Sequence, residues 1–156
     1  VSTFHSTCVR ILRRHIDRLG FDNNFTIYDS DDQKTLMKDI CKRLEIDTKI
    51  YKERTFLNAI SSAKDELMDP VAFELSAAGD YNRQRQAKVY REYQAALKKN
   101  NALDFDDLIM KTVEMLQTES SKTMKDEKKR HFGQKTAQET RLILNSLIRH
   151  MKRQTT

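Results

Sequence analysis

The chain opens with VSTFHSTCVRILRRHIDRLG, residues 1–20, and this stretch indicates the class of the fold. Residues 1–4 have the pattern of a strand end. A helical period follows at once, because apolar residues recur at spacings of three and four: Val9, Leu12, Ile16 and Leu19. Gly20 stands where glycine commonly follows a helix. The stretch therefore predicts an amphipathic helix that ends near Gly20.

The opposite face of this helix is basic. Arg10, Arg14 and Arg18 follow one another at intervals of four residues. Like charges at that spacing repel by a few tenths of a kcal/mol per pair, roughly. A helix start preceded by hydroxyl side chains favours anions, through its free N–H groups and its dipole. Two interpretations stay open, a phosphate-contacting corner and a solvated basic face.

Composition places the chain among helical proteins. Its 156 residues include three Gly and one Pro, and helix-forming residues are plentiful. We therefore expect one all-α domain, an irregular helical bundle of about six to seven helices. The sequence shows neither a membrane-spanning run nor a signal-peptide pattern. Cys8 and Cys41 are expected to be buried free thiols of a cytoplasmic protein.

The positive charge is concentrated at one end of the chain. Residues 1–119 hold 19 Lys and Arg against 20 Asp and Glu, whereas residues 120–156 hold 10 against 3. The net charge of +6 is therefore weak evidence that the main body binds nucleic acid. Residues 120–156 are predicted to be a polar, lysine-rich segment and an amphipathic helix from about Thr136, with Leu142, Ile143, Leu147, Ile148 and Met151 on its apolar side.

Apolar periodicity predicts further helices along the body. A brief extended piece at 24–28 precedes them, and the helices are expected at about 30–44, 53–67, 71–78, 81–99 and from Asp104 to about 116. Ser30 and Gln33 fit a capping box for the first of these. Capping also explains the nearby aspartates better than a metal site does. In the last of these helices the predicted buried face is Phe105, Leu108, Ile109, Thr112, Val113 and Leu116.

Two clusters invite a functional interpretation. On the helix at 81–99, four cations are interleaved with Tyr81 and Tyr90: Arg83, Arg85, Lys88 and Arg91. Such a pattern suits either nucleic-acid binding or a core with a wet basic face. The carboxylates in LDFDDL, residues 103–108, resemble a nuclease acid cluster, but capping and the helix dipole account for them. We reject the catalytic interpretation.

Five segments in order resemble the UvrD/Rep/PcrA family of superfamily 1 DNA helicases. VSTFHSTCVRILRR resembles motif Ib, FTIYDSDDQ the F-x-I-x-D-x-x-D-Q segment, and LDFDDLI the LDF-[AD]-[DE]-LL motif. ISSAKDEL and the helix with VYREYQAAL also agree in order and spacing. Together they reach from residue 1 to about 117, and none extends past 119. The resemblance implies the edge of a motor domain at 1–6 followed by the helical 1B subdomain.

This resemblance implies a parent enzyme that moves 3′ to 5′ along single-stranded DNA, with ATP and Mg²⁺ bound elsewhere. The implied partners are single strands, single-strand/duplex junctions and the remaining helicase domains, with no membrane. Thr3, Phe4, His5 and Ser6 would line the single-strand path. Phosphate contacts would come from Arg10, Arg14, Lys64 and Lys88. Phe4 is the expected stacking residue.

Catalytic motifs are missing from this sequence. It has no G-x-x-x-x-G-K-[ST] phosphate loop and no DE-x-x-D segment. We therefore expect no cofactor in this chain and no ATP hydrolysis by it alone. The alternative function is a stand-alone helical interaction module whose basic C-terminal segment binds a partner protein or nucleic acid.

Overall fold

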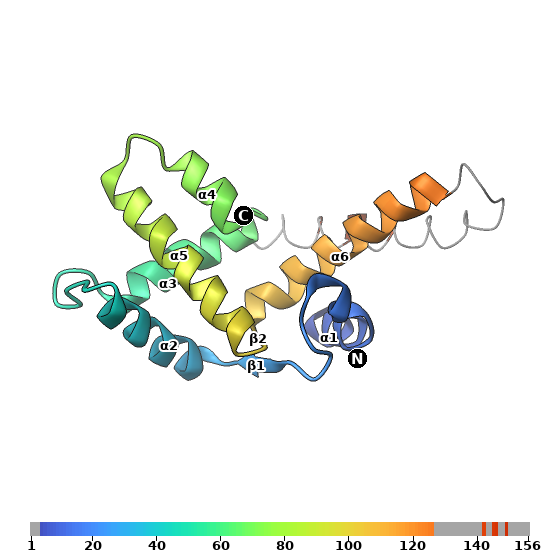
Figure 1. Ribbon diagram of the computed structural model, residues 1–156, viewed down its shortest axis with the longest axis horizontal. Coiled ribbons are helices and arrows are strands. Elements are labelled where there is room, and N and C mark those ends of the chain that lie inside the picture. The colour runs from blue at the N-terminus through green and yellow to red at the C-terminus, as the bar shows by residue number, and fades with distance from the viewer. Residues whose placement is uncertain (1–3, 127–141, 143–144, 147–148, 150–156) are drawn as a thin grey trace. The chain divides into compact units, whose positions relative to one another are not determined.

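A computed structural model describes residues 4–126, 142, 145–146 and 149 (Figure 1). Within these residues the fold has six α-helices, one 3₁₀ helix and two short strands, so the predicted, mostly helical class is confirmed. The chain divides into two compact units, which are described separately. One comprises residues 24–107, and the other joins residues 1–23 to residues 108–156.

Residues 24–107 form a helical unit. Its first and last elements are short strands that pair with each other. Its elements are β1 (Thr26–Tyr28), α2 (Ser30–Arg43), α3 (Glu53–Asp65), α4 (Pro70–Ser76), α5 (Tyr81–Lys99) and β2 (Ala102–Asp104). Helix α5 is central, because it packs against α2, α3 and α4 (Figure 1). Its Tyr90 and Tyr93 are fully buried, and Met37, Ile40, Phe56, Ile60 and Phe73 surround them in the same core.

The two strands pair in parallel, and the sequence predicts only one of them. Thr26 lies opposite Ala102 and Tyr28 opposite Asp104. The extended piece expected at 24–28 is therefore present as β1. The helix predicted from Asp104 is present as α6, which begins at Phe105, but the strand at residues 102–104 was not predicted; backbone pairing with β1 holds these residues extended. Asp104 nevertheless has its predicted capping role, since it accepts the N–H of Asp107 through Oδ1 at 2.8 Å.

The start of α2 shows how a cap can be assigned one residue away from its true place. Asp29, not Ser30, is the N-cap, and its Oδ1 accepts the N–H groups of Asp31 and Asp32 at 2.9 Å each. Asp32 completes the capping box by accepting the Asp29 N–H at 3.1 Å. The prediction of a Ser30–Gln33 box is wrong because a carboxylate one position earlier accepts both donors.

The other unit contains α1 (Phe4–His15), a 3₁₀ turn η1 (Ile16–Leu19) and most of α6 (Phe105–Asp126). Leu12 and Ile16 are fully buried, as the apolar period predicts, and Gly20 ends the segment with φ of 81°. Phe4 was predicted to end a strand, but it begins α1. Residues 1–3, which include Thr3, lie outside the described residues.

Helix α6 buries most of its predicted face. Leu108, Ile109, Thr112, Val113 and Leu116 are buried, whereas Phe105 is exposed at 47%. Phe105 was assigned to the buried face from its spacing, and this is wrong because the helix begins only at that residue.

The helix also continues past 119, to Asp126. The helix predicted from Thr136 lies outside the described residues, apart from positions 142, 145–146 and 149. Among the described residues, no helix combines the length and the hydropathy needed to cross a membrane.

Candidate nucleic-acid interface

One face of α1 presents a line of donors. Ser6, Arg10 and Arg14 are exposed and lie four residues apart, so each is about 6 Å further along the helix than the last. Phe4 and His5 are partly buried at the start of the same helix. The structure therefore places five of the predicted site residues on one helix: Phe4, His5, Ser6, Arg10 and Arg14.

The arginines of α1 and η1 fall into two groups. Arg13 donates to the backbone oxygen of Asn23 at 2.9 Å, and Arg18 forms an ion pair with Glu119. Arg10 and Arg14 form no ion pair with any residue that the structure describes. A guanidinium without an acidic neighbour keeps its full charge and its fork of donors for phosphate. Arg10 and Arg14 are therefore the arginines of α1 and η1 best suited to contact a nucleic-acid backbone.

Lys64 was predicted to contact phosphate, and its position excludes that role. Its side chain is fully buried, with Nζ 2.7 Å from Oδ2 of Asp104 and 3.0 Å from Oδ1 of Asp107. The Tyr93 hydroxyl donates to the same Asp104 oxygen at 3.0 Å, and Gln94 donates to Asp107 at 3.1 Å. We correct the prediction accordingly: Lys64 joins α3 to the β2–α6 corner.

This buried cluster also gives two sequence segments a shared physical role. Lys64 belongs to ISSAKDEL, and Asp104 and Asp107 belong to LDFDDLI. The charged residues of both segments contact each other, 40 positions apart along the chain. The carboxylates expected only to cap α6 therefore also neutralise a buried ammonium, and they are not available as catalytic acids.

The neighbours of each ionisable group in this cluster shift its pKa. Burial lowers the pKa of Lys64, but the carboxylates of Asp107 and Asp104 outweigh it and hold that pKa above its ordinary value. Burial raises the pKa of Asp107, although Lys64 opposes this. Burial and the Asp104 carboxylate raise the pKa of Tyr93, so its hydroxyl remains a donor. Lys64 is therefore the cationic centre of the cluster at neutral pH.

Asp106 lies beside the cluster and gives a pH-dependent prediction. Burial, with the Asp104 carboxylate, raises its pKa to about 6. The folded state then holds the proton more tightly than the unfolded chain does, so this group lowers stability as pH rises from about 4 to about 6. Asp106→Asn should raise the free energy of unfolding at pH 7 by about 1–3 kcal/mol and leave it almost unchanged at pH 4.

Urea denaturation at both pH values checks this expectation for Asp106. The control is Asp31→Asn, since Asp31 is an exposed acid in the first turn of α2. It should change stability by about 0.5 kcal/mol or less at either pH. A D106N protein that is less stable than the wild type at pH 7 would contradict the assignment of a raised pKa.

The cations of α5 divide between structure and surface. Arg91 pairs with Glu74, and the Arg83 guanidinium lies 5.3 Å from the ring centre of Phe73. Both partners belong to α4, so these two arginines attach α4 to α5. Lys88 is exposed, and beside it Arg85 lies between two tyrosine rings. Of the tyrosines interleaved with these cations, Tyr90 belongs to the core and Tyr81 is 72% exposed.

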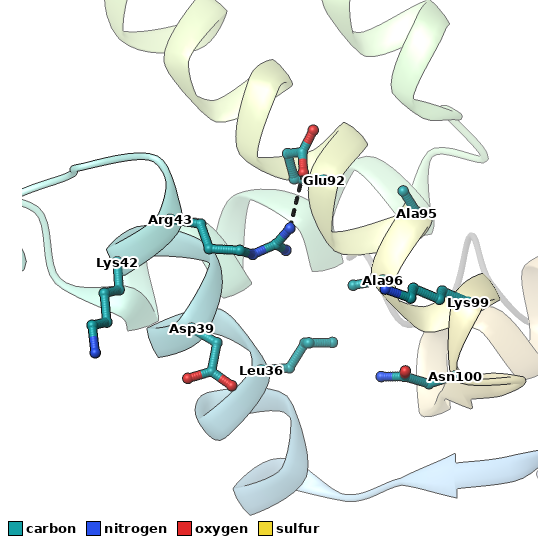
Figure 2. A pocket seen from close by; sticks show the side chains of 9 residues that line it. All are labelled: Leu36, Asp39, Lys42, Arg43, Glu92, Ala95, Ala96, Lys99 and Asn100. Atoms are coloured by element: carbon teal, nitrogen blue, oxygen red, sulfur yellow. Dashed lines mark ion pairs between the residues drawn. The ribbon is translucent and has the colours of Figure 1, made fainter.

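A hollow of this unit lies between α2 and α5 (Figure 2). Leu36, Ala95 and Ala96 supply apolar lining, and Arg43 pairs across it with Glu92 at 3.6 Å. The remaining residues that line it are Asp39, Lys42, Lys99 and Asn100. The lining holds three cations and two carboxylates, so the carboxylates offset most of the attraction for a polyanion. We do not include it in the interface.

Two features of the site escaped sequence analysis. Tyr51, which stacks on Arg85, lies in the turn between α2 and α3, where no periodicity marks it. The burial of Lys64 did have a signal, because Lys64 follows the buried Ile60 by four residues and so shares its helical face. The prediction nevertheless placed Lys64 at the surface, because its side chain carries a charge.

Comparison with known proteins identifies a family and several similar proteins. The UvrD/REP helicase N-terminal domain matches residues 1–154. The chain is 50% identical over 117 residues, 75% of its length, to proteins named ATP-dependent DNA helicase PcrA from Staphylococcus aureus and Staphylococcus epidermidis. It spans 16% of the length of these relatives.

Proposed function

The chain belongs to the UvrD/REP helicase family, and on that premise we propose that it is the DNA-contacting helical 1B subdomain of an ATP-dependent 3′–5′ helicase. The observation that carries the proposal is the donor line on α1. Ser6, Arg10 and Arg14 are exposed at one-turn intervals, and Arg10 and Arg14 are not paired with any described carboxylate. Such a line suits a backbone of repeated phosphates.

The chemistry of these contacts is positioning. Arginines on phosphates orient a strand without reading its sequence, and hydroxyl groups add donors at the helix start. In this proposal Thr3, Phe4, His5 and Ser6 line the single-strand path, and Phe4 stacks on a base. Lys88 provides a further phosphate contact from α5. Lys64 is left out because its ammonium is buried between two carboxylates.

ATP and Mg²⁺ belong to other parts of the parent enzyme in this proposal. The sequence contains no phosphate-loop motif, so its residues do not fit a nucleotide-phosphate site. The contribution of this chain is to hold single-stranded DNA, or a single-strand/duplex junction, next to the remaining helicase domains. Unwinding in DNA replication or repair is the corresponding role of the parent.

A second candidate function rests on charge distribution. Residues 120–156 carry 10 basic side chains against 3 acidic ones. That excess favours binding of nucleic acid or an acidic partner by the C-terminal segment alone, with the body as a scaffold. The two candidates differ in which residues supply the phosphate contacts.

Lowering the charge of the C-terminal segment separates them. The triple variant Lys128→Gln, Lys129→Gln, Arg130→Gln removes three charges without shortening the chain. Fluorescence anisotropy with a labelled single-strand/duplex junction, over a salt series, should show that the variant keeps binding within about threefold of the wild type at equal salt. Loss of all measurable binding would contradict the proposed function and support the scaffold alternative.

A further inference from the structure

We propose that a hollow beside the first half of α5 binds one phosphate of a single-stranded nucleic acid, while Tyr81 stacks on an adjacent base. The proposal deepens the proposed function and rests on it. The hollow measures about 280 Å³. It is lined by the end of α2, the residues after it and α5: Leu44, Ile46, Tyr81, Gln84, Arg85 and Lys88.

Arg85 is held in place before any ligand binds. Its guanidinium carbon lies 4.2 Å from the ring centre of Tyr51 and 4.9 Å from that of Tyr81. Contacts with two tyrosine side chains limit the movement of the guanidinium group, and they raise the pKa of Arg85. A donor that is already oriented loses little conformational entropy when an anion arrives.

One nitrogen of this guanidinium group is buried and unpaired. Nη1 of Arg85 is shielded from solvent and has no hydrogen-bond partner among the described residues. Shielded polar groups in native proteins almost always have partners, and an unpaired donor is unfavourable. Nη1 is covered by protein, so a phosphate in the hollow accepts charge-assisted hydrogen bonds from the part of the Arg85 guanidinium group that lines it.

The charges around the hollow favour an anion. No carboxylate lines it, and within the described part of the chain neither Arg85 nor Lys88 forms an ion pair. The larger groove between α2 and α5 differs, because Asp39 and Glu92 line it together with its cations (Figure 2). A water molecule occupies ~30 Å³ of liquid, so the smaller hollow has room for a phosphate and part of its sugar.

Tyr81 identifies the anion as part of a single strand. Its side chain is 72% exposed and forms the rim of the hollow. An aromatic ring next to a phosphate site provides a surface on which an unpaired base stacks. Free phosphate gains nothing from this ring, so the two sources of phosphate are expected to bind with different strength.

The test measures the NMR signal of the Arg85 side chain in the whole 156-residue chain. Heteronuclear NMR resolves arginine Nε–Hε signals, and the signal that disappears in Arg85→Lys is that of Arg85. Labelled protein is titrated with a short thymidine oligonucleotide and, at equal ionic strength, with inorganic phosphate. The Arg85 signal should shift with both ligands and saturate at a much lower concentration of the oligonucleotide.

Matched variants separate stacking from charge. Tyr81→Leu should weaken oligonucleotide binding at this signal about tenfold and phosphate binding much less, because Tyr51 still contacts the Arg85 guanidinium group. Lys88→Gln should lower the slope of log K against log salt by about 0.7. The control Lys98→Gln changes an exposed lysine on the same helix, about 15 Å away, and should alter neither quantity.

Other results would overturn the proposal. If the Arg85 signal does not shift with either ligand, the hollow is not a phosphate site. If phosphate and the oligonucleotide saturate the signal at the same concentration, the site does not recognise a single strand. If the signal stays unmoved while junction binding still depends on Arg10 and Arg14, only this proposal fails. If the oligonucleotide and the junction both fail to bind, the proposed function fails with it.

Discussion

Replacing Lys64 with methionine should destabilise the protein by about 3–5 kcal/mol at pH 7. The ammonium is fully buried and bridges Asp104 and Asp107 at 2.7 and 3.0 Å. Methionine has a similar length and fills the space, so the expected loss is electrostatic. Two carboxylates would remain in a water-excluded site with Tyr93 and Gln94 as their side-chain donors.

The loss should depend on pH in a defined direction. Burial already raises the pKa of Asp107, and without the ammonium of Lys64 nothing of comparable strength opposes that rise. The folded variant therefore binds more protons than the unfolded chain, and its stability should rise as pH falls from 7 towards 4. Adding Asp107→Asn to Lys64→Met should restore part of the lost stability at pH 7, because one unpaired charge is removed.

Urea denaturation followed by circular dichroism measures these free energies. Lys38→Met is the control, because Lys38 is an exposed lysine on α2 and should cost about 0.5 kcal/mol or less. A Lys64→Met protein within about 1 kcal/mol of the wild type at pH 7 would mean that the cluster is not a structural centre. The removal of Lys64 from the DNA interface would then lose its main support.

The sequence predicted the helices well because their apolar residues repeat with the helical period. The expected ranges 53–67 and 81–99 correspond closely to Glu53–Asp65 and Tyr81–Lys99. Local signals of this kind are contained within about four residues, so they can be read without knowledge of the rest of the chain. The prediction of a mostly helical fold depended on such signals and on a composition with three Gly and one Pro.

The errors lie where distant parts of the chain compete with local preference. Residues 102–104 are extended because β1, more than seventy positions earlier, pairs with them. Asp29 replaces Ser30 as the cap of α2, a difference of one position between two good capping residues. The spacing of the surrounding apolar residues predicts neither the strand at residues 102–104 nor the choice of Asp29 as the cap.

The candidate site was predictable only in part, for the same reason. The spacing of Arg10 and Arg14 is a local property, and both are exposed on one face of α1 as expected. The role of Lys64 depends on Asp104, 40 positions away, and the position of Arg85 depends on Tyr51 in a turn. From the sequence alone, a charged side chain is expected at the surface. Its burial can be recognised only when its partners in the fold are known.

Arg10→Gln with Arg14→Gln should have the largest effect on DNA binding. Each arginine that neutralises a phosphate releases condensed counterions, so each loss lowers the slope of log K against log salt by about 0.7–0.9. The double variant should therefore lower that slope by about 1.4–1.8 and weaken junction binding about 10- to 100-fold at low salt. Both side chains are exposed, and their replacement should leave the unfolding free energy within about 0.5 kcal/mol of the wild type.

The control variant changes the same amount of charge at the same spacing. Lys34 and Lys38 are exposed, four residues apart on α2, and their replacement by glutamine also removes two positive charges. A general electrostatic effect would weaken binding equally in both double variants. A specific backbone contact would weaken it only when Arg10 and Arg14 are changed.

The most direct test of the DNA-contacting function is therefore one salt series with a labelled single-strand/duplex junction, measured by fluorescence anisotropy for these three proteins. We predict that the wild type and Lys34→Gln/Lys38→Gln share one slope, and that Arg10→Gln/Arg14→Gln binds more weakly with a slope smaller by about 1.4–1.8. Equal affinity and equal slope for all three proteins would contradict the assignment of the α1 arginines as DNA contacts.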